Sequence, residues 1–270
     1  MDSKQLSRSS WNGAAAVAAG SRHIERGRPC QDAALVQVSP RPLLAVLDGR
    51  GSSQISQLGS TAMAAAIPAI ISELDDTIAT VLDTDAEVSL AEDQWRSVAQ
   101  EILRRLIAVQ VDCARINGHP VHELEATIVL AVVGRSRVGC LQVGDSVLAA
   151  KQGGVTGMIH VPPLSEFANW TVFITPRLHP ERDLLTRTLL TAGLDGLVAM
   201  TDGMSFFLVD ARSQCPAEGV RQLLERCAAG GLPAEQLAVI VEDARWSTQH
   251  HDDRGIAVLA RANLSPDGSA

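Results

Sequence analysis

The chain has 270 residues, of which 46% are hydrophobic and only 3% aromatic, and it contains no tyrosine. This length suits one large domain or two small ones, with a core built from alanine, valine, leucine and isoleucine. A net charge of −8 without a basic stripe excludes a typical nucleic-acid binder. The same charge suits a soluble protein that collects divalent cations.

The cysteines are scattered and form no CxxC pair: they are Cys30, Cys113, Cys140, Cys215 and Cys227. Such a set is typical of a reduced, cytoplasmic protein and not of a disulfide framework. No apolar run reaches the length of a membrane span, and the first residues lack the apolar segment of a signal peptide. We therefore expect a cytoplasmic protein that does not enter a membrane.

The first third of the chain predicts three strands and one long helix. The strands are expected over 11–20, 33–38 and 43–48. Segment 21–32 is expected to be a loop, because Gly27 and Pro29 break any helix there. A helix is expected over 53–74, kinked or split at Pro68.

The remainder predicts a block of strands between helices. An irregular acidic connection is expected over 75–92 and a helix over 91–116, whose apolar residues fall on one face. Short strands are expected over 126–133, 139–143, 147–150, 155–161, 170–175, 196–201 and 255–260. Further helices are expected over 181–190, 216–228 and 233–246.

Strands and helices thus come in blocks instead of alternating strictly, and tight turns join sequential strands. This pattern indicates an α+β layered fold with mainly antiparallel sheets. We expect a single domain over 11–262, with flexible ends at 1–10 and 263–270.

Two apolar strands end in the same dipeptide. The run Leu43–Leu47 is followed by Asp48 and Gly49, and the run 196–201 is followed by Asp202 and Gly203. A carboxylate at a strand end, beside a glycine that lets backbone approach, is well placed to hold a cation. One isolated Asp-Gly is more often a simple turn, so the repetition is what favours a site.

Three further acids have a comparable position. Asp32 begins a strand, Asp145 lies in a turn between two strands, and Asp252 precedes the last strand. Neighbouring antiparallel strands can bring such ends to one rim, where carboxylates raise one another's pKa unless a cation neutralises them. Oxygen ligands without paired histidine or cysteine suit Mg²⁺ or Mn²⁺ better than zinc. The sequence therefore predicts a two-metal hydrolase of phosphate esters; the alternative is a set of scattered surface acids.

Several short motifs occur in an order that resembles one family. They are GRPCQDA (27–33), AVLDGRGSS (45–53), GSTAMA (59–64), VGDS (143–146), MTDG (200–203) and HDDRGIAVL (251–259). Together they resemble the metal-dependent protein phosphatases of the 2C type, most of all the compact bacterial branch. The resemblance implies a four-layer αββα sandwich of two mainly antiparallel sheets flanked by helices. It also implies a Mg²⁺- or Mn²⁺-dependent protein serine/threonine phosphatase.

The resemblance assigns the central residues of the site. Asp48 would bridge two metal ions, and Gly49 would offer its backbone carbonyl to one of them. Asp202 and Asp252 would complete the protein ligands of the other ion. Catalysis would then rest on the three aspartates Asp48, Asp202 and Asp252.

The resemblance also implies outer positions. Asp32 would bind a metal or a water molecule held by one, and Asp145 matches the acid linked to a third, weaker ion. Asp253 is expected to orient the strand end. Arg26 or Arg28 is a candidate for binding the substrate phosphate, although a solvated loop is an equally good interpretation of both.

The chain departs from the family pattern at several positions. Arg50 stands where the family often has a histidine that is a candidate general acid, and arginine does not release its proton in a useful pH range. Gln31 replaces the first acid of the family's acidic pair, Gly27 replaces its phosphate-binding arginine, and Gly255 replaces a threonine. Possible substitute acids are His23, His250 and His251.

These departures leave other functions open. One hypothesis is a pseudophosphatase, meaning a regulatory binding module on the same fold, and another is a hydrolase of small phosphoesters. For the phosphatase, the expected partner is a protein phosphorylated by a serine/threonine kinase, with no nucleic acid or membrane partner, and the chain is expected to be monomeric.

Overall fold

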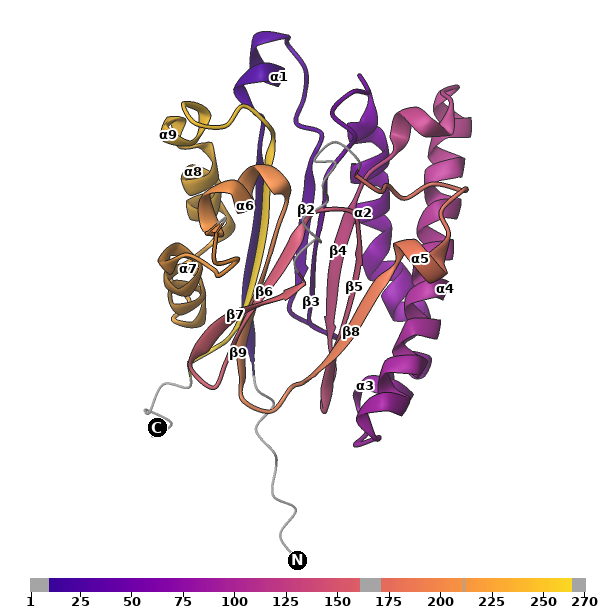
Figure 1. The fold of residues 1–270 in the computed structure, drawn as a ribbon, viewed down its shortest axis with the longest axis vertical. Coiled ribbons are helices and arrows are strands. Elements are labelled where there is room, and N and C mark those ends of the chain that lie inside the picture. The colour runs from indigo at the N-terminus through magenta and orange to yellow at the C-terminus, as the bar shows by residue number, and fades with distance from the viewer. Residues whose placement is uncertain (1–9, 161–170, 211, 264–270) are drawn as a thin grey trace, which may run out of the picture.

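The structure is a computed structural model that describes residues 10–160, 171–210 and 212–263. Two five-stranded sheets lie face to face, with helices on the outer side of each (Figure 1). Every strand pairing within the described ranges is antiparallel. The predicted four-layer αββα sandwich is therefore confirmed.

The first sheet has the spatial order β2-β3-β4-β5-β8. Its strands are β2 (Ala33–Gln37), β3 (Leu43–Leu47), β4 (Ile128–Val133), β5 (Arg137–Val143) and β8 (Leu185–Leu190). The second sheet has the order β1-β10-β9-β6-β7. Its strands are β1 (Trp11–Ala18), β10 (Arg254–Arg261), β9 (Leu194–Met200), β6 (Val147–Gln152) and β7 (Val155–His160).

The helices divide between the two outer layers and the connections, as Figure 1 shows. On the side of the first sheet and its connections lie α2 (Ser56–Glu73), α3 (Asp75–Leu82), α4 (Val88–Asn117), the 3-10 turn η1 (Val121–Leu124) and α5 (Pro180–Asp183). On the side of the second sheet lie α6 (Asp202–Leu208), α7 (Glu218–Ala228), α8 (Ala234–Glu242) and α9 (Ala244–Ser247). The short helix α1 (Ser21–Glu25) follows β1. No helix in the described part of the chain combines the length and apolar character needed to cross a membrane.

Strand β3 shows why an uninterrupted apolar run is needed at the centre of a sandwich. Leu43, Ala45 and Leu47 face the helical layer, whereas Leu44 and Val46 face the second sheet. All five side chains have no exposed surface, since successive strand residues point to opposite faces and both faces are covered. This confirms the prediction of a buried strand leading to Asp48.

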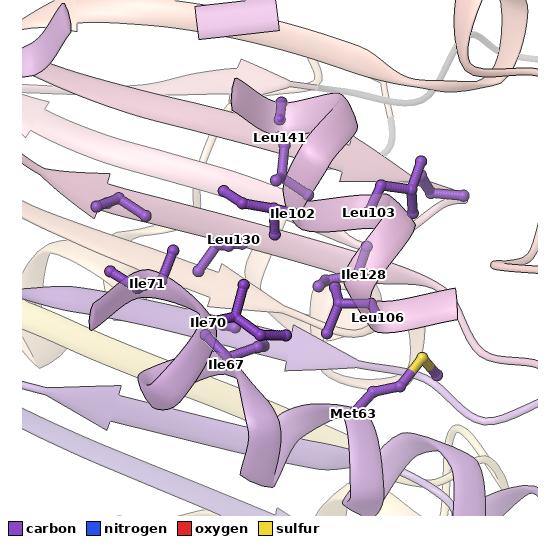
Figure 2. Packing of buried hydrophobic residues seen from close by; sticks show 14 of the residues in the cluster. Met63, Ile67, Ile70, Ile71, Ile102, Leu103, Leu106, Ile128, Leu130 and Leu141 are labelled. Atoms are coloured by element: carbon purple, nitrogen blue, oxygen red, sulfur yellow. The ribbon is translucent and has the colours of Figure 1, made fainter. Parts of the chain in front are cut away.

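The outer core of the first sheet is aliphatic (Figure 2). Helices α2 and α4 place residues at three- and four-residue spacing onto the outer face of the first sheet. The packed residues include Met63, Ile67, Ile70 and Ile71 of α2, Ile102, Leu103 and Leu106 of α4, and Ile128, Leu130 and Leu141 of the sheet. Pro68 lies inside α2 without ending it, so the helix is not split at that residue.

Two segments that were expected to be irregular are helical. Residues 21–25 form α1, and Gly27, with φ of 62°, lies just beyond the helix instead of preventing it. The acidic segment after α2 contains α3, in which Ile78, Val81 and Leu82 are buried. Acids in the first turn of α3 suit the positive end of the helix dipole, so their charge marked a helix start and not a loop.

Other differences concern β8, the segment around 170–175, and α6. The predicted helix 181–190 is helical only up to Asp183, and its remainder is β8, which pairs with β5. In the predicted strand 170–175, residue 170 lies outside the described residues, and the rest forms only one bridge, from Ile174 to Ala126. Helix α6, which begins at Asp202, was not predicted. The expected flexible ends lie almost entirely outside the described residues.

Candidate active site

Acids from both sheets meet at one rim of the sandwich. In the β2–β3 ladder Ala33 faces Leu47, so Asp32 and Asp48 leave the first sheet side by side. In the β6–β9 ladder Val147 faces Met200, which brings Asp145 and Asp202 together at the edge of the second sheet. Asp252 enters the same rim just before β10, which pairs with β9.

The electrostatics of Asp48 show how close these carboxylates are. Desolvation raises the pKa of Asp48 well above its usual range, and the negative charges of Asp32, Asp202, Asp145 and Asp252 raise it further. Desolvation also raises the pKa of Asp32, which is only 5% exposed, and the neighbouring acids add to the effect. A cluster of this kind favours protons or cations as neighbours.

Asp202 is held at the centre of the same cluster. Desolvation, followed by the charges of Asp252 and Asp145, raises the pKa of Asp202 to about 6, although interactions with Asp48 and with the Gly203 amide lower it. When they are ionised, these neighbouring carboxylates repel one another. A divalent cation would relieve this repulsion, because it interacts with several carboxylates at once.

Hydroxyl side chains fix the acids in place. The Thr201 hydroxyl donates to Asp32 Oδ2 at 2.7 Å and so links the two sheets at the rim. The Thr171 hydroxyl donates to Asp145 Oδ2 at 2.6 Å. The Asp48 amide donates to Thr127 Oγ1 at 3.2 Å. None of these three residues was given a role from the sequence, although Thr127 and Thr201 each place a hydroxyl at the end of an apolar strand.

Two buried oxygens at the site have no hydrogen-bond partner among the described residues: Asp145 Oδ1 and Gln31 Oε1. An unpaired buried acceptor is costly, and a cation or a water molecule at the rim would satisfy it. As the side chains stand, no group of three or more His, Cys, Asp or Glu in the described ranges is arranged to hold a metal ion. Some of the acid side chains must therefore rotate to ligate an ion. Their donors are hard oxygens, of the type that Mg²⁺ and Mn²⁺ prefer.

The glycine after each aspartate is required by close backbone packing. A Cβ on Gly49 would lie 2.5 Å from the Gln31 carbonyl oxygen, and a Cβ on Gly203 would lie 1.9 Å from the Asp253 carbonyl oxygen. The Gly49 amide also donates to the Gln31 carbonyl at 3.2 Å. The repeated Asp-Gly therefore marks two places where a neighbouring segment of the rim lies directly against the strand end.

Asp253 acts as a clamp on the segment between β1 and β2. Its carboxylate, in a residue 3% exposed, accepts from the Gly20 amide at 2.7 Å and from the Gln31 amide at 2.5 Å. The buried ring of His23 lies 2.8 Å from the same carboxylate through Nδ1. These contacts are those of a residue that orients the rim.

The candidate phosphate-binding arginines lie on the clamped segment. Arg26 is exposed and follows α1, and Arg28 is half-buried, with its amide donating to the His23 carbonyl at 2.9 Å. In the described part of the chain neither guanidinium makes an ion pair or a hydrogen bond. The structure therefore brings the acids together but does not bring either arginine into contact with them.

Arg50 is held differently. Its Nη1 donates to Glu125 at 2.8 Å and its Nε donates to Ser52 Oγ at 2.8 Å. The guanidinium carbon also lies 5.9 Å from the centre of the Phe173 ring. The residue that replaces the expected histidine is thus fixed at the edge of the site.

The chain is similar to a curated phosphatase and to solved structures of the same fold. Serine/threonine-protein phosphatase 3 of Escherichia coli strain K12 is 25% identical over 214 residues, which cover 77% of this chain and 79% of that protein. Among solved structures, PppA of Pseudomonas aeruginosa superposes with a TM-score of 0.55 at 19% identity, covering 94% of this chain and 99% of PppA.

Two structures of the phosphatase PstP also superpose on this chain. The Mycobacterium tuberculosis structure has a TM-score of 0.58 at 15% identity and covers 94% of this chain and 100% of that one. A PstP catalytic domain in complex with two manganese ions has a TM-score of 0.54 at 16% identity, with coverage of 94% and 99%. These likenesses establish the fold.

A family model described as Protein phosphatase 2C matches residues 19–241. The match covers most of the chain and includes four of the five clustered acids; the fifth, Asp252, follows on the strand connection into β10. The chain belongs to the protein phosphatase 2C family, whose members are phosphoprotein phosphatases.

Proposed function

We propose that this chain is a Mg²⁺- or Mn²⁺-dependent protein serine/threonine phosphatase. The observation that carries the proposal is the meeting of five aspartates from both sheets at one rim, in a chain of this family. The proposed substrate is a cytoplasmic protein phosphorylated by a serine/threonine kinase, and the free cysteines suit a reducing compartment.

Each acid has a proposed part in holding two ions. Asp48 lies centrally and would serve both, with the Gly49 carbonyl beside it. Asp202 and Asp252, from the second sheet, would hold one ion from the opposite side. Bound ions would supply an activated water nucleophile and neutralise charge on the phosphate during in-line attack.

Asp32 and Asp145 are proposed for the outer positions. Asp32 is fixed by Thr201 and would act on the ions directly or through water. Asp145 has one oxygen held by Thr171 and one without a partner, so it is proposed for a third, weaker ion. Arg26 and Arg28 stay candidates for binding the phosphate, because Asp253 holds Gly20 and Gln31, on either side of them, at the rim.

Hydrolysis of a phosphothreonine peptide tests this function. The protein should release phosphate when Mn²⁺ is added and stop when EDTA is added in excess. Purified protein that shows no metal-dependent turnover on phosphopeptide or aryl phosphate would contradict the proposal. Comparing a phosphopeptide with nucleotides separates a protein phosphatase from a hydrolase of small phosphoesters.

Substitution of Asp48 gives the matched test of the metal centre. Asp48→Asn removes one charge from the crowded rim, so the fold should be retained, with a melting temperature equal to or above that of the wild type in EDTA. Activity should fall by at least about a hundredfold, since a central ligand is lost. Asp85→Asn, the same change at an exposed position, is the control and should keep full activity.

A second candidate function is a pseudophosphatase, and two observations favour it. Arg50 is ion-paired with Glu125 and cannot serve as an acid, and Gln31 places an uncharged amide where the family has a carboxylate. Mn²⁺ binding by calorimetry without phosphopeptide turnover would favour this module over the enzyme.

A further inference from the structure

The side chain of Arg50 lies on the same face of the backbone as that of Asp48. Beyond β3 the chain continues as an extended pair: Thr127 N donates to the Asp48 carbonyl at 2.8 Å, and Arg50 N donates to the Glu125 carbonyl at 2.9 Å. Gly49 bridges Ala126 between them. In extended backbone, residues two apart point to the same side, so the acid and the guanidinium project together.

The opposite strand agrees with this placement. Asp48 contacts Thr127 through the threonine hydroxyl, and Arg50 contacts Glu125 through its carboxylate. The first of these contacts is made by the Asp48 backbone amide and the second by the Arg50 guanidinium. The backbone ladder sets Asp48 opposite Thr127 and Arg50 opposite Glu125, and alternate residues of such a ladder lie on one face. Arg50 therefore extends the face of Asp48 outward from the rim.

A third segment connects Arg50 to the acids. Thr171 holds Asp145, the Ile174 amide donates to the Ala126 carbonyl at 2.8 Å, and Phe173 between them lies beside the guanidinium. The same stretch of chain thus touches an acid of the cluster and Arg50. This places Arg50 beside the acidic rim.

One side of the guanidinium is fixed and the other is accessible. Nη1 donates to Glu125 and Nε donates to Ser52, and within the described residues Nη2 donates no hydrogen bond. The Arg50 side chain is 40% exposed, whereas that of Glu125 is 13% exposed. An arginine held in this way loses little conformational freedom when it binds a ligand through its remaining donors.

A substrate phosphate meets an unfavourable field at this rim. Five carboxylates repel a dianion, and cations are needed on its path. A guanidinium presents donors in a fork that matches phosphate oxygens. The guanidinium of Arg50 is already held in a fixed orientation beside the rim.

We propose that Arg50 binds the phosphoryl group of the substrate, with Glu125 and Phe173 fixing its orientation. The proposal rests on the proposed phosphatase function and adds to it a phosphate contact other than Arg26 and Arg28. The role is binding and positioning, because arginine keeps its proton.

Binding of inorganic phosphate to the Mn²⁺-loaded protein tests the proposal directly by calorimetry. Arg50→Gln should weaken phosphate binding about tenfold or more, since a charge-assisted contact is lost. Arg50→Lys should fall between the two, because it keeps the charge but not the fork. Arg115→Gln, the same charge change near the C-terminal end of α4 at a side chain that is 71% exposed and paired with Asp112, should bind phosphate as the wild type does.

Kinetics add a second readout. With a phosphothreonine peptide, Arg50→Gln should raise KM about tenfold and lower kcat by less, while Mn²⁺ affinity stays within about twofold of the wild type. If the unpaired Glu125 prevents folding of this variant, the double variant Arg50→Gln, Glu125→Gln replaces it. The melting temperature of each variant shows whether it is folded.

The outcomes separate this proposal from the proposed function. Loss of phosphate binding in Arg50→Gln supports the role of Arg50 even if the wild type turns over no substrate. Equal phosphate binding by Arg50→Gln and Arg115→Gln overturns it even if the wild type is an active phosphatase. A wild type that binds Mn²⁺ but no phosphate overturns it as well.

Discussion

At the level of single residues, the acids of the rim combine burial with mutual repulsion. Asp32 and Asp48 have strongly raised pKa values for both reasons, and Asp202 is held at about 6. Acids in such a state destabilise the fold when they are ionised and stabilise a bound cation. The same charges that cost stability are therefore the basis of the proposed function.

The pKa of Asp202 predicts a pH dependence of stability. Its folded value of about 6 lies above the usual 3.8, so the folded state holds the proton more tightly than the unfolded state does. The stabilisation by protonation is lost as the pH rises from about 4 to about 6, and the penalty is complete above that range. In EDTA, the melting temperature of the wild type should therefore drop relative to that of Asp202→Asn as the pH is raised from about 5 to about 7.

Thermal unfolding of wild type and Asp202→Asn in EDTA across this range measures that difference. The expected gap corresponds to an order of 1–3 kcal/mol at neutral pH. Identical pH profiles for the two proteins would show that Asp202 is not held in a raised state.

At the level of elements, the strands that carry the acids were predictable because their chemistry is local. An apolar run that ends in Asp-Gly predicts a buried strand followed by a turn, and both β3 and β9 agree with this prediction. Their meeting was predicted from strand adjacency and from the family resemblance. The partners of the acids were not, because Thr127, Thr171 and Thr201 are brought to the rim by pairing between distant segments.

The missed elements have physical causes of the same kind. Strand β8 lies at the edge of its sheet and exposes Leu185 and Leu190. The spacing of its leucines in the sequence therefore favoured a helix. Helix α3 buries three residues under an acidic start. In both cases packing against a neighbouring element decided the structure, and sequence periodicity does not report such packing.

The clamp formed by Asp253 gives a prediction at this scale. Asp253→Asn replaces an acceptor oxygen with an amide group and leaves the Gly20 amide, the Gln31 amide or His23 without its partner. Unfolding in urea should show a loss of about 1–3 kcal/mol. Hydrogen exchange at the amides of Gly20 and Gln31 should accelerate more than exchange in the core of β4.

The control for this variant is Asp85→Asn, which makes the same change on an exposed side chain. If Asp253→Asn matched that control in both urea unfolding and amide exchange, the clamp would have no energetic role. A loss of stability without faster exchange at Gly20 and Gln31 would also contradict the local effect.

At the level of the whole molecule, the rim exists only when both sheets are packed. Asp32 and Asp48 come from strand ends of the first sheet, and Asp202 and Asp252 come from the second. Asp145 lies on the connection from β5 of the first sheet to β6 of the second. The apolar layer between the sheets includes Leu44, Val46, Leu197 and Ala199. Its thickness sets the distance between the acids of the two sheets. Metal binding should therefore be coupled to the complete fold, because the unfolded chain has no such cluster.

The central claim is that these acids form one centre for two divalent ions, with Asp48 shared between them. Calorimetric titration of the EDTA-treated and dialysed protein with Mn²⁺ tests it most directly. We expect the wild type to bind about two ions per chain, and Asp48→Asn, although folded, to bind fewer ions or to bind them at least about tenfold more weakly. A wild type that binds no Mn²⁺, or an Asp48→Asn variant that binds it with unchanged number and affinity, would contradict the claim.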